Sequence, residues 1–382
     1  MRMRFFYIIA FILCLTMGIT GGGIAGDTGE TVVRIGHVAP LTGPQAHLGK
    51  DNENGVRLAI DDLNAKGFEI GGQKVRFELV AEDDQADPRQ GTTVAQKLVD
   101  EKVNGVIGHL NSGTTIPASR IYQAAGMPQI SPSATNPKYT LQGFETAFRV
   151  MANDEQQGRV LGEFAVKTLE AKTIAIIDDR TAYGQGLADE FKKAVETLGG
   201  KIVDRQYTTD KATDFSAILT SIKGKRPNLV FFGGMDAQGG PLLKQMKQLG
   251  LTAAFLGGDG ISTPEFVKLA GDAAEGQYSS LPGVPLSAMP GGPDFERRFT
   301  ARFGKIQLYA PYCYDAVMVM ADAMRRAGSS QPADYLQVLH RTNYQGVTTR
   351  VRFDQNGDLR NGAITVYQVK GGLWEARNTF GG

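Results

Sequence analysis

Residues 32–66, VVRIGHVAPLTGPQAHLGKDNENGVRLAIDDLNAK, join a short β-branched run to a long amphipathic segment. The run Val32–Val38 has the length and composition of a buried strand, and Gln45–Lys66 carries apolar residues at helical spacing. The same alternation of short apolar runs and longer amphipathic segments continues along the chain. It predicts parallel sheets covered by helices.

Two such α/β units are expected, each with four main strands. In the first, strands are predicted at Val32–Val38, Lys74–Ala81, Gly105–Gly108 and Pro128–Ser131, and helices at Gln45–Lys66, Pro88–Val103 and Thr114–Ala125, before Phe148–Val150 leads away. In the second, strands are predicted at Thr173–Asp178, Lys201–Thr208, Asn228–Gly233 and Ala253–Gly257, with helices at Asp154–Glu170, Gly186–Leu198, Phe215–Gly224 and Gln238–Leu249 and a return strand at Gln277–Leu281.

The last hundred residues follow a different pattern. A stretch rich in proline and glycine, residues 282–293, precedes three predicted helices at Asp294–Phe303, Tyr309–Ala327 and Pro332–Arg341. Antiparallel strands are then expected at Arg350–Phe353, Ala363–Val369 and Leu373–Ala376, with a glycine turn at Gly371-Gly372. We expect two lobes joined by more than one segment: residues 31–149 with 282–360, and residues 150–281 with 361–382. Hinged lobes of this kind close on ligands.

The N-terminus resembles a targeting segment. Arg2 and Arg4 precede the apolar run Phe5 to Met17, which gives way to glycines before it is long enough to span a bilayer. A membrane anchor is the alternative. We expect a signal peptide over residues 1–25, cleaved after Ala25, and a periplasmic mature protein.

Charge and cysteine content exclude some classes of protein. Without residues 1–25 the chain has 39 basic and 40 acidic residues, so no nucleic acid or other polyanion is implied as a partner. Only Cys313 would remain after processing, which rules out an intramolecular disulfide. The full chain is 42% apolar, which is sufficient for two hydrophobic cores.

Ligands of parallel sheets bind beyond the carboxyl ends of the strands. Ser112 and Thr114 follow one predicted strand in the first unit, at a helix N-terminus that can receive an anion. Either residue could instead be a simple N-cap. After the next strand come Ser133 and Thr135, whose hydroxyls can serve both ends of a zwitterion, although an ordinary Ser/Thr turn is the alternative.

The second unit offers an aromatic and an acid at equivalent places. Tyr183 lies at the mouth of a predicted helix, where it could also simply pack on its own lobe. Asp259 lies between Gly258 and Gly260, so that backbone can approach closely and one carboxylate is presented. That carboxylate suits an ammonium group, and a solvated turn aspartate is the alternative.

Sequence signatures of enzymes and metal sites are missing. There is no G-x-G-x-x-G after a strand, no G-x-x-x-x-G-K-[ST], no G-x-S-x-G and no H-E-x-x-H. The four histidines are not clustered at metal-ligand spacing. We therefore expect no catalysis, no cofactor and no metal; an exported enzyme using Asp259 and Tyr183 as acid and base is the competing hypothesis.

Several motifs resemble those of one family. They are VAPLTGP at residues 38–44 with Leu48-Gly49, Asp83, Asp84 and Asp87-Pro88, IGHL at 107–110, SPSAT at 131–135, and Asp179 through YGQGLA at 183–188. In this order, over about residues 32–374, they resemble the leucine/isoleucine/valine-binding proteins of ABC transporters. The resemblance implies the type I periplasmic-binding fold: two Rossmann-like α/β lobes with parallel-rich sheets and a multi-strand hinge.

The resemblance also implies roles for individual residues. Ser112 would hold a ligand carboxylate, Thr135 would contact carboxylate and ammonium, and the carbonyl of Ser133 would accept from the ammonium. Tyr183 would cover the ligand, and Asp259 would stand where the family uses glutamate. Residues Leu48, Met235 and Tyr309 would line the side-chain pocket.

Three departures from the family affect the expected ligand. Leu48 and Met235 replace expected aromatics, and the disulfide pair of close relatives falls at Ala86 and Asn111. We expect a monomeric binding protein that captures a small amino acid, favouring leucine, isoleucine or valine, and delivers it to a membrane permease. An amide or aromatic acid as ligand, and a ligand-sensing receptor subunit, are the alternatives.

Overall fold

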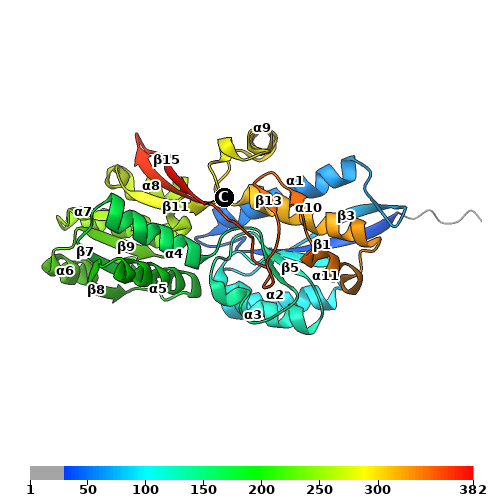
Figure 1. Ribbon diagram of the computed structural model, residues 1–382, viewed down its shortest axis with the longest axis horizontal. Coiled ribbons are helices and arrows are strands. Elements are labelled where there is room, and N and C mark those ends of the chain that lie inside the picture. The colour runs from blue at the N-terminus through cyan, green and yellow to red at the C-terminus, as the bar shows by residue number, and fades with distance from the viewer. Residues whose placement is uncertain (1–29, 382) are drawn as a thin grey trace, which may run out of the picture.

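The computed structural model describes residues 30–381, so the predicted signal peptide lies outside the described residues. Two lobes lie side by side along the long axis of the molecule (Figure 1). Lobe I is built on a six-stranded sheet and lobe II on a seven-stranded sheet. The expectation of a mixed α/β fold with two parallel-rich sheets is confirmed.

The sheet of lobe I has the strand order β2-β3-β1-β4-β5-β6. Its strands are β1 (Thr31–Ala39), β2 (Glu69–Ile70), β3 (Gln73–Asp83), β4 (Gly105–Gly108), β5 (Gln129–Ser131) and β6 (Ala147–Arg149). β1 runs parallel to β3 and β4, with Ile35 opposite Leu79 on one side and Gly105 on the other. The carboxyl ends of β1, β4 and β5 therefore meet at one edge of the sheet.

Helices cover both faces of this sheet. They are α1 (Ala46–Ala65), α2 (Pro88–Asp100) and α3 (Ser112–Ala124), joined later in the chain by α9 (Gly292–Phe303), α10 (Ala310–Ala327) and α11 (Pro332–His340). α1 packs with α10 and α2 packs with α3. Side chains of β1 alternate between the two layers: Val33 and Ile35 pack on the α1 side, and Val38 packs with Val94 and Leu98 of α2.

Lobe II has the strand order β15-β14-β11-β10-β9-β7-β8. The strands are β7 (Thr173–Asp178), β8 (Lys201–Tyr207), β9 (Leu229–Gly233), β10 (Ala254–Gly257), β11 (Tyr278–Pro282), β14 (Ile364–Lys370) and β15 (Leu373–Phe380). Its helices are α4 (Asp154–Glu163), α5 (Ala182–Thr197), α6 (Ser216–Lys225), α7 (Asp236–Gln248) and α8 (Pro264–Ala270). Ile174 and Ile176 face one helical layer, and Ala175 and Ile177 face the other.

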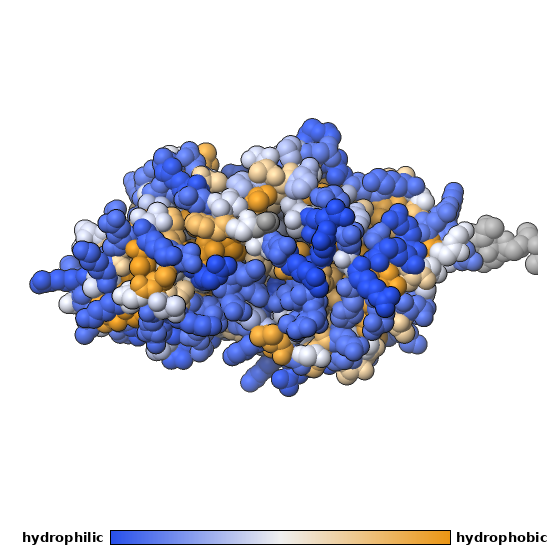
Figure 2. Space-filling view, viewed as in Figure 1, coloured by the Kyte–Doolittle hydropathy of each residue, from blue (hydrophilic) through white to orange (hydrophobic). Residues whose placement is uncertain are grey.

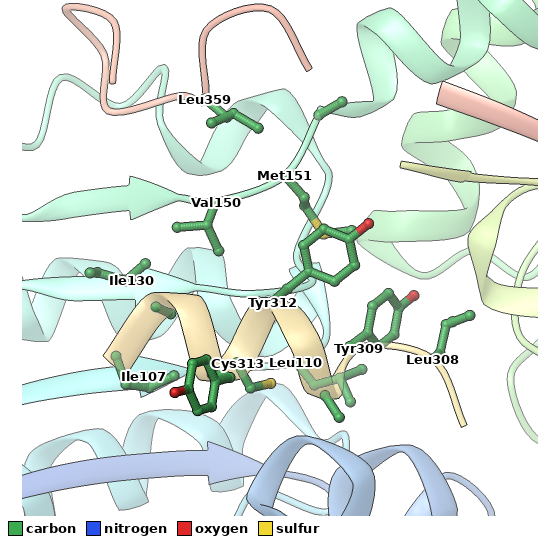
Figure 3. Close-up of a cluster of buried hydrophobic side chains, with 14 of the residues drawn as sticks. Ile107, Leu110, Ile130, Val150, Met151, Leu308, Tyr309, Tyr312, Cys313 and Leu359 are labelled. Carbon is green, nitrogen blue, oxygen red and sulfur yellow. The ribbon is translucent and has the colours of Figure 1, made fainter. Parts of the chain in front are cut away.

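The chain passes between the two sheets three times. β6 belongs to the first sheet and β7 to the second, α9 and α10 return to pack on α1, and β14 joins β11 in the second sheet. Figure 3 shows the buried side chains beside one crossing, where Tyr312 in the first turn of α10 lies near Met151. The hydroxyl of Tyr312 donates to the carbonyl of Pro282 in the second crossing.

Several predicted boundaries were wrong for identifiable reasons. Phe148 does not lead away from the sheet but belongs to strand β6. α5 begins four residues earlier than predicted, because the Thr181 hydroxyl accepts from the N–H of Gly184 and caps the helix at that point. After Glu163 the helical segment continues as a π-helical turn, Phe164–Thr168.

The C-terminal strands were only partly predicted. The hairpin of β14 and β15 turns at Gly371-Gly372 as expected, because both glycines adopt positive φ. The segment Arg350–Phe353 contains only the short strand β13 (Arg350–Val351), which pairs with β12 (Tyr344–Gln345). Phe353 forms an isolated bridge with Leu359.

The described surface is mostly hydrophilic on the face shown in Figure 2, with small scattered apolar patches. Of the helices within residues 30–381, none combines the length and the apolar character needed to cross a bilayer.

Candidate functional site

Polar residues meet where the carboxyl ends of strands from both lobes approach each other. Ser112 is the first residue of α3, the helix that follows β4, and Thr135 follows β5. Tyr183 lies in the first turn of α5 after β7, and Asp259 follows β10 in a short 3-10 turn, Asp259–Ile261. All four side chains are buried.

Asp259 is the centre of the best-defined contacts. Its Oδ1 accepts hydrogen bonds from the Tyr183 hydroxyl at 2.8 Å and from Gln157 Nε2 at 3.1 Å. Its Oδ2 accepts from the Tyr309 hydroxyl at 2.7 Å. Burial raises the pKa of this carboxyl, and the three side-chain hydrogen bonds only partly oppose that effect. The alternative of a solvated turn aspartate is wrong, because only 1% of the residue is exposed.

The two glycines that flank Asp259 allow this packing. A Cβ atom on Gly258 would lie 2.7 Å from the Tyr183 hydroxyl oxygen, and one on Gly260 would lie 2.9 Å from Cε1 of the same ring and from the sulfur of Met235. Side chains at these positions would displace the tyrosine from the carboxylate. Tyr183 and Met235 are thus neighbours around the same loop.

Lobe I contributes hydroxyl groups from two adjacent loops. The Ser112 Oγ accepts from the backbone N–H of Asn136 at 3.2 Å, which ties the two loops together. The Thr135 Oγ1 is buried and has no hydrogen-bond partner among the described residues. Ser133 Oγ donates to the carbonyl of Leu110 at 3.1 Å, so its side chain stabilises the contact between the two loops.

The alternative interpretation of Ser112 or Thr114 as an N-cap is wrong. Asn111 occupies the N-cap position of α3, and no side chain caps this end. Thr114 Oγ1 donates to the carbonyl of Asn111 instead. The N-terminus of α3 therefore keeps backbone N–H groups that no side-chain cap occupies.

Asp154 is a candidate site residue that was not predicted. It is the first residue of α4, it is fully buried, and neither of its carboxylate oxygens has a hydrogen-bond partner within residues 30–381. Burial and then the charge of nearby Asp259 raise its pKa well above the usual range, and the nearby Thr135 hydroxyl only partly opposes this effect. Its backbone N–H donates to the carbonyl of Thr135 at 2.9 Å, which fixes Asp154 beside that loop.

The three residues predicted to line the side-chain pocket differ in how they contact Asp259 and Tyr183. Tyr309 reaches Asp259 directly, and Met235 lies beside Tyr183 around Gly260. Leu48 of α1 is fully buried and belongs to the same apolar cluster as Tyr183, Met235 and Tyr309.

A cavity of about 370 Å³ lies between the lobes next to this centre. Tyr183 and Met235 line it from lobe II, and Gln45 and Asn111 line it from lobe I. Ser112, Thr135 and Asp259 are not part of its lining. These three residues are buried, and Ser112 lies between Asn111 and Gly113, which both line the cavity.

Several hydrogen bonds connect the lobes directly, including the one from the backbone N–H of Asp154 to the carbonyl of Thr135. Tyr309 of lobe I donates to Asp259, Asn136 Nδ2 of lobe I donates to the carbonyl of Ala182 at 2.5 Å, and His47 of α1 lies 2.8 Å from Asp236 of α7. The lobes are therefore in contact around the site. Within the described residues, no group of three His, Cys, Asp or Glu side chains is arranged to hold a metal ion.

Comparisons with known proteins agree with this architecture. The model of a family described as periplasmic binding protein matches residues 32–373. The chain is 36% identical over 341 residues to Leu/Ile/Val-binding protein homolog 1 of Brucella suis, covering 89% of this chain and 91% of that protein.

It is 35% identical over 355 residues to a leucine-, isoleucine-, valine-, threonine- and alanine-binding protein of Pseudomonas aeruginosa, covering 92% of each. A solved structure, the branched-chain amino acid transporter substrate-binding protein of Streptococcus pneumoniae in complex with isoleucine, superposes with a TM-score of 0.84 at 27% identity. The match covers 92% of this chain and 100% of that one. The chain therefore belongs to the periplasmic binding protein family and has its two-lobed type I fold.

Proposed function

We propose that this protein is the solute-binding component of an ABC importer and that it binds leucine, isoleucine or valine between its lobes. The observation that carries the proposal is the cluster of buried acceptors formed by Asp259, Asp154 and Thr135. These side chains belong to different segments of the chain. The Thr135 hydroxyl lies close enough to Asp154 to favour its ionised form, and no other group of the described chain hydrogen-bonds to either side chain.

The cluster has the chemistry of an ammonium site. Two buried carboxylates near each other are costly when ionised, because burial and mutual repulsion both disfavour the charge. A ligand ammonium donates three hydrogen bonds and brings a positive charge, which would favour the ionised form of both acids. Thr135 Oγ1 would accept from the same group.

The N-terminus of α3 would receive the ligand carboxylate. Its backbone N–H groups and the positive end of the helix dipole favour an anion, and Ser112 adds a hydroxyl. Ser133 would contribute its carbonyl to the ammonium. The two ends of an α-amino acid would thus bind on adjacent loops of lobe I, and Tyr183 and Asp259 would close over them from lobe II.

The side-chain pocket favours an apolar ligand. Leu48 and Met235 are aliphatic, and Tyr309 presents a ring whose hydroxyl is already bonded to Asp259. The names of the Brucella suis and Pseudomonas aeruginosa relatives include binding of leucine, isoleucine and valine, and the Streptococcus pneumoniae structure contains isoleucine, which supports the same choice here. An amide or aromatic acid has no ammonium group and would leave Asp154 and Asp259 without a cation.

Catalysis is not part of the proposal. Burial and then the charge of Asp259 raise the pKa of the Tyr183 phenol well above its usual value, so it would not act as a base near neutral pH. We further propose that residues 1–25 are a cleaved signal peptide, that the mature protein is a periplasmic monomer, and that a membrane permease receives the ligand. Lobe boundaries near residues 150, 282 and 361 would match the three crossings.

Calorimetry on protein refolded from denaturant, and so free of carried-over ligand, tests the ligand class. L-Leucine, L-isoleucine and L-valine are titrated in parallel with benzoate and isovaleramide, which lack the ammonium. We expect binding of at least one of the three amino acids and none of the other two compounds. Binding of benzoate or the amide alone would refute the amino-acid assignment.

Small-angle scattering tests the motion. We expect the radius of gyration to fall when the best-binding amino acid saturates the protein, because the lobes close around it. An unchanged radius with demonstrated binding would contradict closure.

A further inference from the structure

One contact between the lobes involves neither the acceptor cluster nor the predicted pocket residues. His47, the second residue of α1 in lobe I, places Nε2 2.8 Å from Oδ2 of Asp236, the first residue of α7 in lobe II. Thr263 Oγ1 donates to the same oxygen at 2.6 Å. The His47 side chain is 23% exposed, and that of Asp236 is fully buried.

The position of this pair links it to the pocket. His47 directly precedes Leu48, and Asp236 directly follows Met235, so the pair adjoins two residues of the proposed apolar pocket. Because its members belong to different lobes, separation of the lobes breaks it. The Thr263 bond stays within lobe II and holds the carboxylate in place in either state.

We propose that His47 and Asp236 form an ionic latch that exists only when the lobes are closed, so that closure takes up a proton at His47 and the affinity for ligand weakens as the medium becomes more alkaline. This inference rests on the proposed binding of an amino acid between the lobes. In this proposal His47 influences the affinity for the ligand without contacting the ligand.

The surroundings of His47 favour its protonated form in the closed state. Burial by itself lowers the pKa of the imidazole, but the hydrogen bond and charge of Asp236 outweigh it, and the charge of Glu265 on α8 acts in the same direction. The net effect is a raised pKa. On α1 itself, Lys50 is paired with Glu53 at 2.9 Å, and Asp51 accepts from the backbone N–H groups of residues 307–310.

The sign of the pH dependence follows from this shift. In the open state His47 loses Asp236 and is expected to titrate near the ordinary value of about 6.5. The ion pair therefore stabilises the closed state to its full extent below that pH. Its contribution is lost as the pH rises through the higher value of the closed state.

The test is calorimetry of L-leucine binding between pH 6 and 8.5 at constant ionic strength, with wild type, His47→Gln and His340→Gln. His340 is the matched control, because it bonds to the carbonyl of Glu145 within lobe I, away from the lobe contact. We expect wild-type affinity to fall by about three- to tenfold across this range, as for a partly buried ion pair. His340→Gln should behave like wild type.

His47→Gln keeps a side chain that can hydrogen-bond to Asp236 but cannot titrate. We expect its affinity at pH 6 to equal the alkaline value of wild type and to change little with pH. Proton uptake on binding, measured in buffers of different ionisation enthalpy at pH 7, should be present in wild type and reduced in His47→Gln. Equal pH profiles and equal proton uptake in the two proteins would overturn the latch.

Failure of the proposed function is a separate outcome. If none of leucine, isoleucine and valine binds, the ligand assignment falls, and the latch is judged on scattering of the ligand-free protein. A radius of gyration that is smaller at pH 6 than at pH 8.5 in wild type, but not in His47→Gln, supports it. The same pH response in both proteins refutes it.

Discussion

The hydroxyl of Tyr309 lies 2.7 Å from Oδ2 of Asp259, although the two residues belong to different lobes. The other contacts of this carboxylate, with Tyr183 and Gln157, stay within lobe II. Asp259 is therefore held in place before closure, and Tyr309 completes its surroundings only when the lobes meet. Because the Asp259 side chain is already ordered, ligand binding does not include the entropy cost of fixing it.

Asp259→Asn tests the proposed ammonium contact, because it keeps the size of the side chain and removes its charge. Truncating one member of a desolvated charge pair costs about 2–5 kcal/mol. We expect affinity for leucine, measured by calorimetry, to fall about thirtyfold or more. Tyr309→Phe is the comparison: it removes one donor and leaves the charge, so the loss should be about three- to tenfold. Unchanged affinity in Asp259→Asn would remove this residue from the site.

Asp154→Asn tests the second buried carboxylate. If the ligand ammonium is what favours the ionised form of Asp154, the amide should lower leucine affinity by about tenfold or more, since a charge-assisted contact is lost. Glu155→Gln is the matched control, because Glu155 is the next residue of α4 and is exposed. Calorimetry on both variants at pH 7 checks this. Equal affinities in the two variants would mean that Asp154 makes no contact with the ligand.

The sequence predicted the architecture better than it predicted contacts between the lobes. Strands such as Thr173–Asp178 were recovered to the residue because a continuous apolar run between polar loops has few other interpretations. Asp154 gave no signal, because an acid in the first turn of a helix is ordinarily explained by the helix dipole. Its backbone N–H is bonded to Thr135 of lobe I, and local sequence patterns do not contain information about such a contact.

The role of Asp259 was only half predicted. Its flanking glycines suggested a close backbone approach, but not that the approaching group is the Tyr183 ring. The bond from Tyr309 joins residues 50 positions apart across the cleft. Periodicity and turn chemistry describe one element at a time, so a contact that depends on the closed arrangement of two lobes lay beyond them.

Leu48→Ala tests the apolar pocket through selectivity. Removing the branched end of a buried leucine should weaken leucine binding by about tenfold, because a methylene in such a pocket contributes about 1–3 kcal/mol. The enlarged space should favour phenylalanine relative to leucine. Leu63→Ala, in the core part of the same helix, should lower the melting temperature and leave the ratio unchanged. Competition calorimetry measures the ratio, and equal ratios in all three proteins would place Leu48 outside the pocket.

Asp179→Asn tests how a buried acid near the cleft affects stability. Asp179 Oδ1 accepts from the backbone N–H of Thr181 at 2.9 Å and from its hydroxyl at 2.6 Å, whereas Oδ2 has no partner among the described residues. Burial raises the pKa of this carboxyl to about 6. In the unfolded chain an aspartate titrates near 3.9, so between these values the folded protein binds more protons and stability falls as the pH rises.

Above pH 6 the wild-type protein therefore carries a charge that destabilises the fold. Asparagine keeps the acceptor used by Thr181 and places its NH₂ group at the unpaired position. We expect the free energy of unfolding, measured in urea, to increase by about 1–3 kcal/mol at pH 8 and to change little at pH 4. Asp214→Asn should lower the free energy of unfolding at pH 8. The hydroxyl and backbone N–H of Ser216 lower the pKa of that exposed carboxyl, so its charged form stabilises the fold. A gain for Asp179→Asn that is the same at pH 4 and pH 8 would show that removal of a buried charge is not its cause.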